Sequence, residues 1–206
     1  MKIKKLNIHD AFEFTFPVNK DHRGLFFRTF CKKTLKELKI NFSTVQQSIC
    51  YNFKKGTVRG MHWQTGKDSE RKIVRVISGK VYDVIIDMRK NSKTYLKWDS
   101  VILSEKKRNA LYVPPNCAHG YMTLEKNSNL IYLIDNFFNK RTIKMFYKDK
   151  SLKIKWPKIK KITMEDEFDD ISFLDQDKLK KQEDKVKSGE ISCNLDSPEE
   201  CESCSG

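Results

Sequence analysis

Short segments rich in β-branched and aromatic residues recur through most of the chain, and this pattern limits the fold more than any other feature. Glycine, proline and small polar residues break the segments at short intervals, as is typical of an antiparallel sandwich or barrel. We expect residues 72–77 and 81–88 to form a hairpin around the turn Ser78-Gly79, and residues 34–39 to be helical. The other predicted strands are residues 98–103, 110–113, 120–124 and 129–136.

The sequence lacks the long apolar runs that a membrane protein needs. No run approaches the roughly 20 residues that cross a bilayer. The first residues carry a basic head without an apolar stretch behind it. We therefore expect no membrane span, no secretory signal and a cytoplasmic location. In that compartment the 6 cysteines are expected to be thiols rather than a disulfide framework.

The charge of the chain is strongly positive: 41 Lys and Arg against 27 Asp and Glu give +14. Such a chain attracts anions, among them nucleic acids and phosphorylated small molecules. The lysines are spread along the whole length rather than gathered into one stripe with interleaved aromatic residues. The charge therefore favours an anionic small-molecule ligand, and no nucleic-acid partner is expected.

The composition divides the chain into three parts. Residues 1–170 contain the strand pattern and are expected to form one folded domain. Residues 171–187 have the composition of a polar helix without an apolar stripe. Residues 188–206 are acidic and contain no basic or aromatic residue, so they are expected to form a disordered tail.

Polar residues capable of chemistry gather in three segments of the predicted domain. The first, residues 56–79, contains Arg59, His62 and Lys72 around a glycine-punctuated turn. In the second, a Pro-Pro turn precedes His119, and in the third Tyr132 stands in the middle of a strand. Because alternate residues of a strand point into a small barrel, these segments are expected to meet on one interior wall.

Several stretches match a known family in residue type and in spacing. They are Asp21-His22-Arg23-Gly24 with Phe26 and Phe30, and residues 56–64, 72–79, 81–89 and 113–124. From about residue 4 to residue 157 the chain resembles the dTDP-4-dehydrorhamnose 3,5-epimerases, which are metal-free cupins. The resemblance implies an all-β, cupin-type jelly roll (double-stranded β-helix) with short peripheral helices, and a homodimer.

The resemblance also implies a reaction and three catalytic residues. The expected reaction inverts C3, C5 or both of a 4-keto-6-deoxy nucleotide-sugar, for deoxysugar and surface polysaccharide biosynthesis. His62 is then the base beside the ketone, Lys72 holds the enolate oxygen, and Tyr132 is the acid on the opposite face of the sugar. A base, an oxyanion stabiliser and an acid suffice for this inversion, so no cofactor is expected.

By the same resemblance, the ligand is a nucleotide-diphosphate sugar held by residues around the catalytic group. Arg23 and Arg59 are expected to hold the diphosphate through bidentate contacts. Gln47 and His119 are expected to make polar contacts to the ligand, and Phe138 to stack on the base.

The chain departs from the family pattern in the residues that hold the ligand. Arg28, assigned here to substrate binding, stands where the family commonly has Glu, and Ile49 where it has Asn. Phe138 replaces a Tyr, and Thr142 lies near the position of a further Glu. These departures leave the catalytic residues intact but support an alternative, a non-catalytic or repurposed cupin that binds a nucleotide-sugar or another anion.

Two further expectations concern the surroundings of the histidines. Metal-binding cupins carry His-x-His at the position where this chain has His62-Trp63-Gln64, so no metal is expected. The resemblance also implies an acid that orients His62 within residues 162–170, where Asp166, Glu167 or another acid takes this place. Asp83 lies inside an apolar strand, and we expect it to pair with His62 or Lys72 or to point outward.

Overall fold

The computed structural model describes residues 1–145 and 152–158, which belong to a compact unit spanning Met1–Ile159. The predicted boundary near residue 170, the polar helix at 171–187 and the tail at 188–206 lie outside the described residues and stay predictions. No helix among the described residues is long and apolar enough to cross a membrane.

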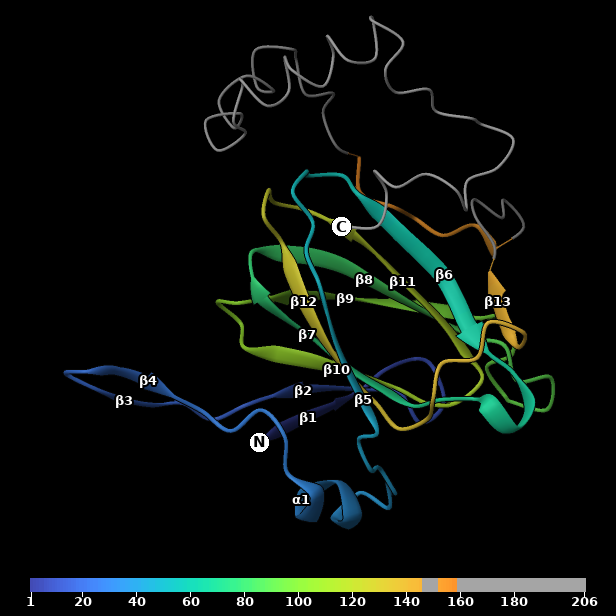
Figure 1. Cartoon of the computed structure of the whole chain (residues 1–206), viewed down its shortest axis with the longest axis horizontal. Helices are drawn as coiled ribbons and strands as arrows, with labels where there is room; N and C mark the ends of the chain where they lie inside the picture. The colour runs from blue at the N-terminus through green and yellow to red at the C-terminus, as the bar shows by residue number, and fades with distance from the viewer. Residues whose placement is uncertain (146–151, 159–206) are drawn as a thin grey trace, which may run out of the picture. The chain divides into compact units, whose positions relative to one another are not determined.

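Two antiparallel sheets face each other in this unit (Figure 1), and they confirm the expected jelly roll. One sheet has the strand order β1-β2-β10-β7-β12-β5, and the other β13-β6-β11-β8-β9. The strands of the first are β1 (Lys2–Lys5), β2 (Phe12–Thr15), β10 (Asn109–Val113), β7 (Lys72–Ser78), β12 (Asn129–Ile134) and β5 (Gln46–Cys50). Those of the second are β13 (Ile143–Met145), β6 (Val58–Gln64), β11 (Cys117–Thr123), β8 (Lys80–Asp87) and β9 (Trp98–Ser104).

The apolar residues form three layers because each strand alternates between two faces. The central layer lies between the sheets and takes inward-facing residues from both, such as Val74, Ile85 and Leu111. A second layer covers the outer face of the six-stranded sheet, where Leu35 of α1 (Lys32–Glu37) is buried. On the outer face of the five-stranded sheet, residues 152–156 contribute to a third layer.

The expected hairpin around Ser78-Gly79 is wrong, because β7 and β8 belong to different sheets. β7 pairs with β10 and β12, whereas β8 pairs with β11 and β9. Gly79 takes a φ of +75°, and a Cβ there would lie 2.5 Å from the Oγ of Ser128. Gly79 therefore forms the tight turn through which the chain passes from one sheet to the other.

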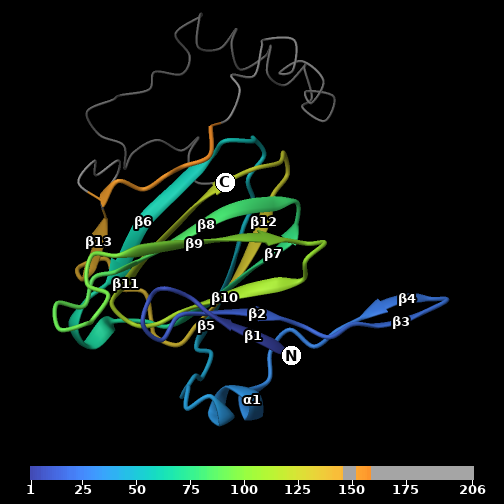
Figure 2. The same ribbon diagram turned by 180° about the vertical axis from the view of Figure 1, so that it is seen from behind.

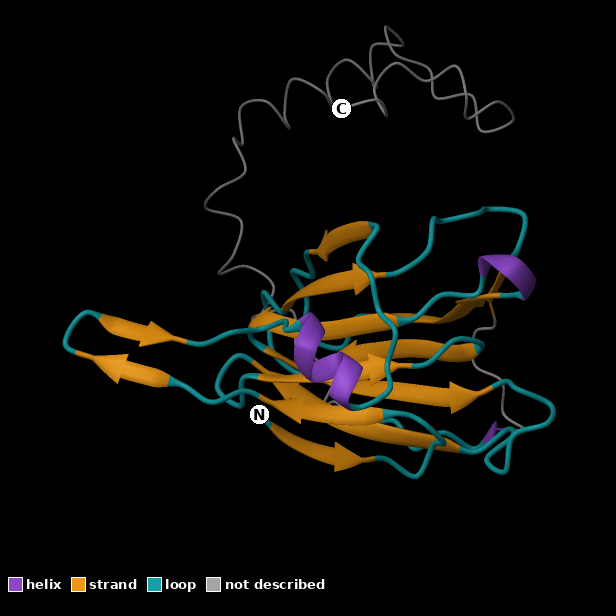
Figure 3. Ribbon diagram, turned by 90° about the horizontal axis from the view of Figure 1, so that it is seen from below, coloured by secondary structure: helices purple, strands orange, loops and turns teal. Residues whose placement is uncertain are grey.

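The predicted helix at 34–39 is confirmed, with its bounds two residues earlier than expected. Cys31 is its N-cap residue, and Lys39 takes a left-handed φ of 60° that cannot continue the helix. Figure 3 shows α1 lying over the strands of the sheet. A short 3-10 turn at Gly66–Asp68 follows β6.

A separate two-stranded hairpin, β3 (Asn19–Asp21) and β4 (Gly24–Phe26), projects away from both sheets (Figures 1 and 2). All six of its strand residues are exposed. The exposed fraction reaches 53% for Leu25 and 69% for Phe26. Apolar side chains on a projecting hairpin are characteristic of a surface that another molecule covers.

Candidate active site

The three predicted catalytic residues lie between the sheets, but on two facing walls rather than on one. His62 is on β6 of the five-stranded sheet, opposite His119 of β11. Lys72 on β7 and Tyr132 on β12 belong to the other sheet. The ring centroids of His119 and Tyr132 are 6.1 Å apart, and those of His62 and His119 are 6.4 Å apart. The expected single wall is therefore corrected, since the base and the phenol come from opposite sheets.

Two glycines let the strands that carry the histidines approach each other closely. A Cβ at Gly60 would lie 2.6 Å from the carbonyl oxygen of His119, and one at Gly120 would lie 2.7 Å from that of Arg59. Any larger residue would push β6 and β11 apart. The ladder between the two strands also shifts register between His119 and Tyr121. This local packing fixes the two imidazoles next to each other.

The surroundings of His62 keep its imidazole neutral. Burial disfavours the charged ring, and the electrostatic influence of Lys72 and then of His119 acts in the same direction. Together they lower the pKa of His62 to about 3. A neutral imidazole has a free lone pair, so His62 is in the protonation state that a general base needs.

Asp83 pairs with His119, which corrects the expectation that its partner is His62 or Lys72. His119 Nε2 lies 2.8 Å from Asp83 Oδ1, and neither side chain has any solvent exposure. Burial raises the pKa of Asp83, while His119 and Lys72 act in the opposite direction. Among the described residues, Asp83 Oδ2 and His119 Nδ1 have no hydrogen-bond partner. Two polar atoms of the Asp83–His119 pair are therefore available to form hydrogen bonds beside His62.

Lys72 is held by a buried carboxylate that the sequence analysis missed. Its Nζ lies 2.7 Å from Glu70 Oε1, and the exposed fractions of the two side chains are 5% and 8%. The other carboxylate oxygen, Glu70 Oε2, accepts a hydrogen bond of 3.0 Å from Gln64 Nε2. Because it is paired, the ammonium group can stay charged in a buried place. The ion pair also keeps the Lys72 ammonium group on one side of the site.

Gln64, only 1% exposed, connects this ion pair to the loop that carries Phe138. Its amide nitrogen donates to the carbonyl oxygen of Phe137, and its amide oxygen accepts from the backbone of Asn139. The backbone N–H of Phe138 donates to Gln46 Oε1 at 2.7 Å, while the Phe138 side chain is 60% exposed. Phe138 therefore presents a free ring from a backbone that is held on both sides.

A hydrogen-bonded network lies on the Tyr132 side of the site. The hydroxyl group of Tyr121 donates a hydrogen bond of 3.1 Å to Asn52 Oδ1. The same Asn52 oxygen accepts a bond of 2.9 Å from Arg59 Nε. Burial, above all, raises the pKa of Tyr132 well beyond its usual value near 10. Tyr132 is therefore a protonated phenol over the physiological pH range.

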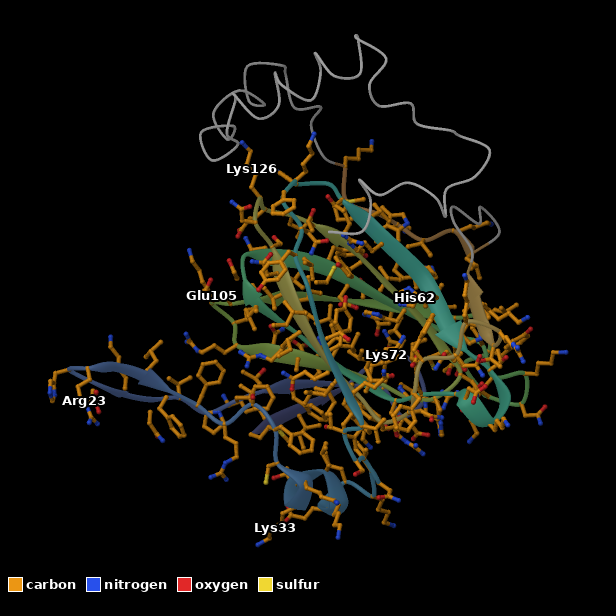
Figure 4. All side chains as sticks on the ribbon, viewed as in Figure 1. Arg23, Lys33, His62, Lys72, Glu105 and Lys126 are labelled. Carbon is orange, nitrogen blue, oxygen red and sulfur yellow. The ribbon has the colours of Figure 1, made fainter. Side chains whose placement is uncertain are left out.

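The other predicted ligand contacts are more scattered. Gln47 is exposed on the edge strand β5. Figure 4 shows Arg23 on the projecting hairpin, away from His62 and Lys72, and its guanidinium is bonded to Asp21. Arg28 lines a small cavity beside α1 together with Met1, Phe16, Pro17, Phe30, Cys31 and Thr34. Within one chain, Arg23 and Arg28 do not join the group around His62.

Two expectations about the histidine surroundings are not tested. Asp166 and Glu167, the predicted partners of His62, lie outside the described residues. The part of the chain that the structure describes contains no group of three or more His, Cys, Asp or Glu side chains placed to hold a metal ion. The absence of a metal from the reaction remains a prediction.

The residues missed by the sequence analysis differ in how they could have been found. The apolar strand around Asp83 predicts either a basic partner or an outward position, and the structure shows a basic partner other than the two expected. Glu70 stands two residues before Lys72, so both side chains are on the same side of an extended segment, which is a usable signal. Asn52 and Tyr121 are 69 residues apart, and no local pattern indicates their contact.

A family model described as dTDP-4-dehydrorhamnose 3,5-epimerase matches residues 5–179. A dTDP-4-dehydrorhamnose 3,5-epimerase of Mycobacterium tuberculosis is 34% identical over 158 residues, which are 76% of this chain and 78% of that protein.

Solved structures have the same fold. The dTDP-4-dehydrorhamnose 3,5-epimerase of Bacillus anthracis, with TDP and PPi bound, has a TM-score of 0.74 and 33% identity, and the match covers 81% of this chain and 97% of that one. The dTDP-6-deoxy-D-glucose-3,5-epimerase of Legionella pneumophila, in complex with dTDP-4-keto-L-rhamnose, has a TM-score of 0.73 and 29% identity, with 79% and 86% covered.

Proposed function

The chain belongs to the dTDP-4-dehydrorhamnose 3,5-epimerase family, and on this premise we propose that it inverts C3, C5 or both of a dTDP-linked 4-keto-6-deoxy sugar. One observation carries the proposal. A neutral imidazole on one sheet and a protonated phenol on the other lie on opposite sides of the same site, with an ammonium group beside them. This is the set of groups that an inversion next to a ketone requires.

The reaction follows from the protonation states of the three groups. His62 removes the proton from the carbon beside the ketone, and the electron pair of that C–H bond moves into an enolate. The ammonium group of Lys72 stabilises the oxygen on which negative charge develops. Tyr132 gives its proton to the carbon from the opposite face, which inverts the centre. Exchange with solvent then removes the proton from His62 and returns one to Tyr132.

The nucleotide and the sugar are assigned to the residues around this centre. Arg59 would hold the diphosphate, with its Nε fixed on Asn52 and its remaining guanidinium N–H groups directed to the ligand. The exposed ring of Phe138 would stack on the base. The buried His119 Nδ1, which has no described partner, would bond to a hydroxyl group of the sugar. The relative from Bacillus anthracis has TDP bound, which supports a nucleoside diphosphate as part of the ligand.

A homodimer would bring in the ligand contacts that one chain lacks. The projecting hairpin carries Arg23 at its exposed end, and apolar Leu25 and Phe26 beside it are exposed as well. The strand β5, which contributes Gln47, is the edge of its sheet. We place Arg23 and Arg28 at the site of a second copy, where the hairpin would cover its exposed apolar side chains.

The proposed setting is the cytoplasm, in the biosynthesis of deoxysugars and surface polysaccharides. The described cysteines Cys31, Cys50 and Cys117 are free thiols, which suits a reducing compartment.

The test is an NMR assay in D2O with a panel of 4-keto-6-deoxy nucleotide-sugars, dTDP-4-keto-6-deoxyglucose first. We expect deuterium at C3, C5 or both, together with inversion at the exchanged carbon. His62→Ala should abolish both signals while a nucleoside diphosphate still binds. If no sugar of the panel exchanges although nucleotide binds, the chain is the non-catalytic binding protein that the altered residues Arg28, Ile49 and Thr142 allow.

A further inference from the structure

Gln64 is the last residue of β6, and its side chain is 1% exposed. Its amide nitrogen lies 3.0 Å from Glu70 Oε2 and from the carbonyl oxygen of Phe137, and 3.1 Å from that of Asp68. Its amide oxygen accepts a hydrogen bond from the backbone N–H of Asn139. Gln64 thus joins β6 to the segment before β7 and to the loop after β12.

The orientation of the Gln64 amide follows from its neighbours. An amide nitrogen only donates and an amide oxygen only accepts, so a flipped amide would turn its oxygen toward three acceptors. The two protons of the nitrogen serve three oxygens, and of these three the Glu70 carboxylate is charged and therefore the strongest acceptor. The placement of the Gln64 amide, and with it the bond to the Phe137 carbonyl, therefore depends on Glu70.

Glu70 in turn needs two acceptor atoms, because both of its partners only donate. Its Oε1 lies 2.7 Å from Lys72 Nζ, and its Oε2 accepts from Gln64. An ammonium group has no acceptor, and the amide nitrogen of Gln64 has none either. A glutamine at position 70 would give its oxygen to Lys72 and turn its own NH2 group toward that of Gln64.

We propose that Gln64 is a positioning residue that couples the Lys72 ion pair to the loop that carries Phe138. The inference rests on the proposed function, in which Lys72 holds the sugar oxygen and Phe138 stacks on the base. The backbone on both sides of Phe138 is bonded to Gln64, and the carboxylate that holds Lys72 is bonded to it as well. Gln64 therefore sets the distance at which the site holds the base and the sugar oxygen of one ligand.

The test measures the Kd for dTDP by calorimetry. In the proposed assignment dTDP makes no contact with Lys72 or Glu70, because it lacks the sugar. We nevertheless expect Glu70→Gln to raise this Kd roughly 3- to 10-fold, the worth of one hydrogen bond that holds the Phe138 loop. In a chain that already has Phe138→Ala, the same change should alter Kd by less than about twofold, because the ring that contacts the base is absent.

Gln64→Glu tests the coupling by a second route. Alone it places two carboxylates against each other, and it should raise the Kd for dTDP in a chain with Phe138 but not in one with Phe138→Ala. Combined with Glu70→Gln it again opposes a donor to an acceptor. The double exchange should therefore bind dTDP about threefold or more tightly than Gln64→Glu alone.

The matched control is Glu125→Gln, which makes the same change in the exposed ion pair with Lys80. It should leave the Kd for dTDP within about twofold of the wild type, because a surface pair contributes little. Each protein is measured below its own melting temperature, so that only folded chains are compared.

The outcomes separate this inference from the proposed function. The inference is wrong if Glu70→Gln leaves the Kd for dTDP unchanged, if its effect persists in full beside Phe138→Ala, or if the double exchange binds no more tightly than Gln64→Glu. A chain that shows the coupling but exchanges no sugar in D2O contradicts the epimerase and leaves the coupling standing. A wild-type chain that does not bind dTDP overturns both.

Discussion

The rings of His119 and Tyr132 meet edge to face across the gap between the two sheets, with their centroids 6.1 Å apart. His119 is bonded to the buried Asp83 on the side away from this contact. The His119 ring is thus held by a buried polar partner. We propose that the sugar binds in this gap, whose two walls belong to different sheets.

The first prediction concerns the titration of His62. Its imidazole should stay neutral as the pH falls from 7 to about 4, because burial and Lys72 lower its pKa to about 3. In Lys72→Met the midpoint should rise, since one positive neighbour is removed. NMR titration of the imidazole resonances measures both midpoints, with His62→Gln to identify the signal. A wild-type midpoint near the ordinary value of about 6.5 would contradict this account of the site.

The lowered pKa of His62 also makes the free energy of unfolding depend on pH. Between about pH 6.5 and 3 the unfolded chain binds a proton at His62 and the folded chain does not. The contribution of the neutral His62 imidazole to the free energy of unfolding is therefore fully present above about pH 6.5 and is lost as the pH falls toward 3. In His62→Gln, the free energy of unfolding should decline less steeply over this range in urea titrations.

A second prediction concerns the Asp83–His119 pair, which has no solvent exposure. Asp83→Ala leaves His119 buried without its carboxylate, and the free energy of unfolding should fall by about 3–5 kcal/mol. As the matched control, Glu125→Ala removes the carboxylate of the exposed pair with Lys80 and should cost about 1 kcal/mol or less. Urea denaturation measures both. Equal losses in the two variants would show that burial of the pair has been misjudged.

The third prediction is that Glu70 and Lys72 are strongly coupled. Each single variant, Glu70→Leu or Lys72→Met, leaves one charge buried without its partner, whereas the double variant removes both. The loss of stability in the double variant should therefore be smaller than the sum of the single losses by about 2 kcal/mol or more. Both variants lacking Lys72 should also lose about 10²–10³-fold in kcat. Additive stability losses would contradict the ion pair.

The fourth prediction concerns the diphosphate. dTDP should raise the melting temperature of the wild type by mass action. Arg59→Ala and Arg23→Ala should each reduce this shift, because each removes a charge-assisted contact worth about 10- to 100-fold in Kd. Lys90→Ala, which removes an exposed charge between β8 and β9, should not. An unchanged shift in both arginine variants would place the anion elsewhere.

The alternation of residues predicts many of the strands of this fold, but it does not predict which strands pair with each other. The two faces of β8 follow directly from the alternation of its residues, and β9 and β10 lie within one residue of the predicted ranges at each end. The partner of β7 does not follow from such a pattern. A glycine turn of the same sequence can close a hairpin or carry the chain to the facing sheet, and only the packing around Gly79 decides between them.

In the site, likewise, the catalytic residues are predictable from the sequence, whereas the residues that hold them in place are not. His62, Lys72 and Tyr132 are found because they belong to motifs with recognisable spacing. Their supports are contacts between distant parts of the chain, and such contacts leave no local signal. The hydrogen bond from the Tyr121 hydroxyl to Asn52 is an example, because Asn52 lies 69 residues earlier in the chain, on the segment between β5 and β6.

A crystal structure of the chain with a dTDP-linked 4-keto-6-deoxy sugar bound would test the central claim most directly. The account predicts that the sugar ring lies between the His62 imidazole and the Tyr132 hydroxyl, one on each face, with its carbonyl oxygen within hydrogen-bond distance of Lys72 Nζ. A sugar with both groups on the same face, or bound away from the gap between the sheets, would contradict it.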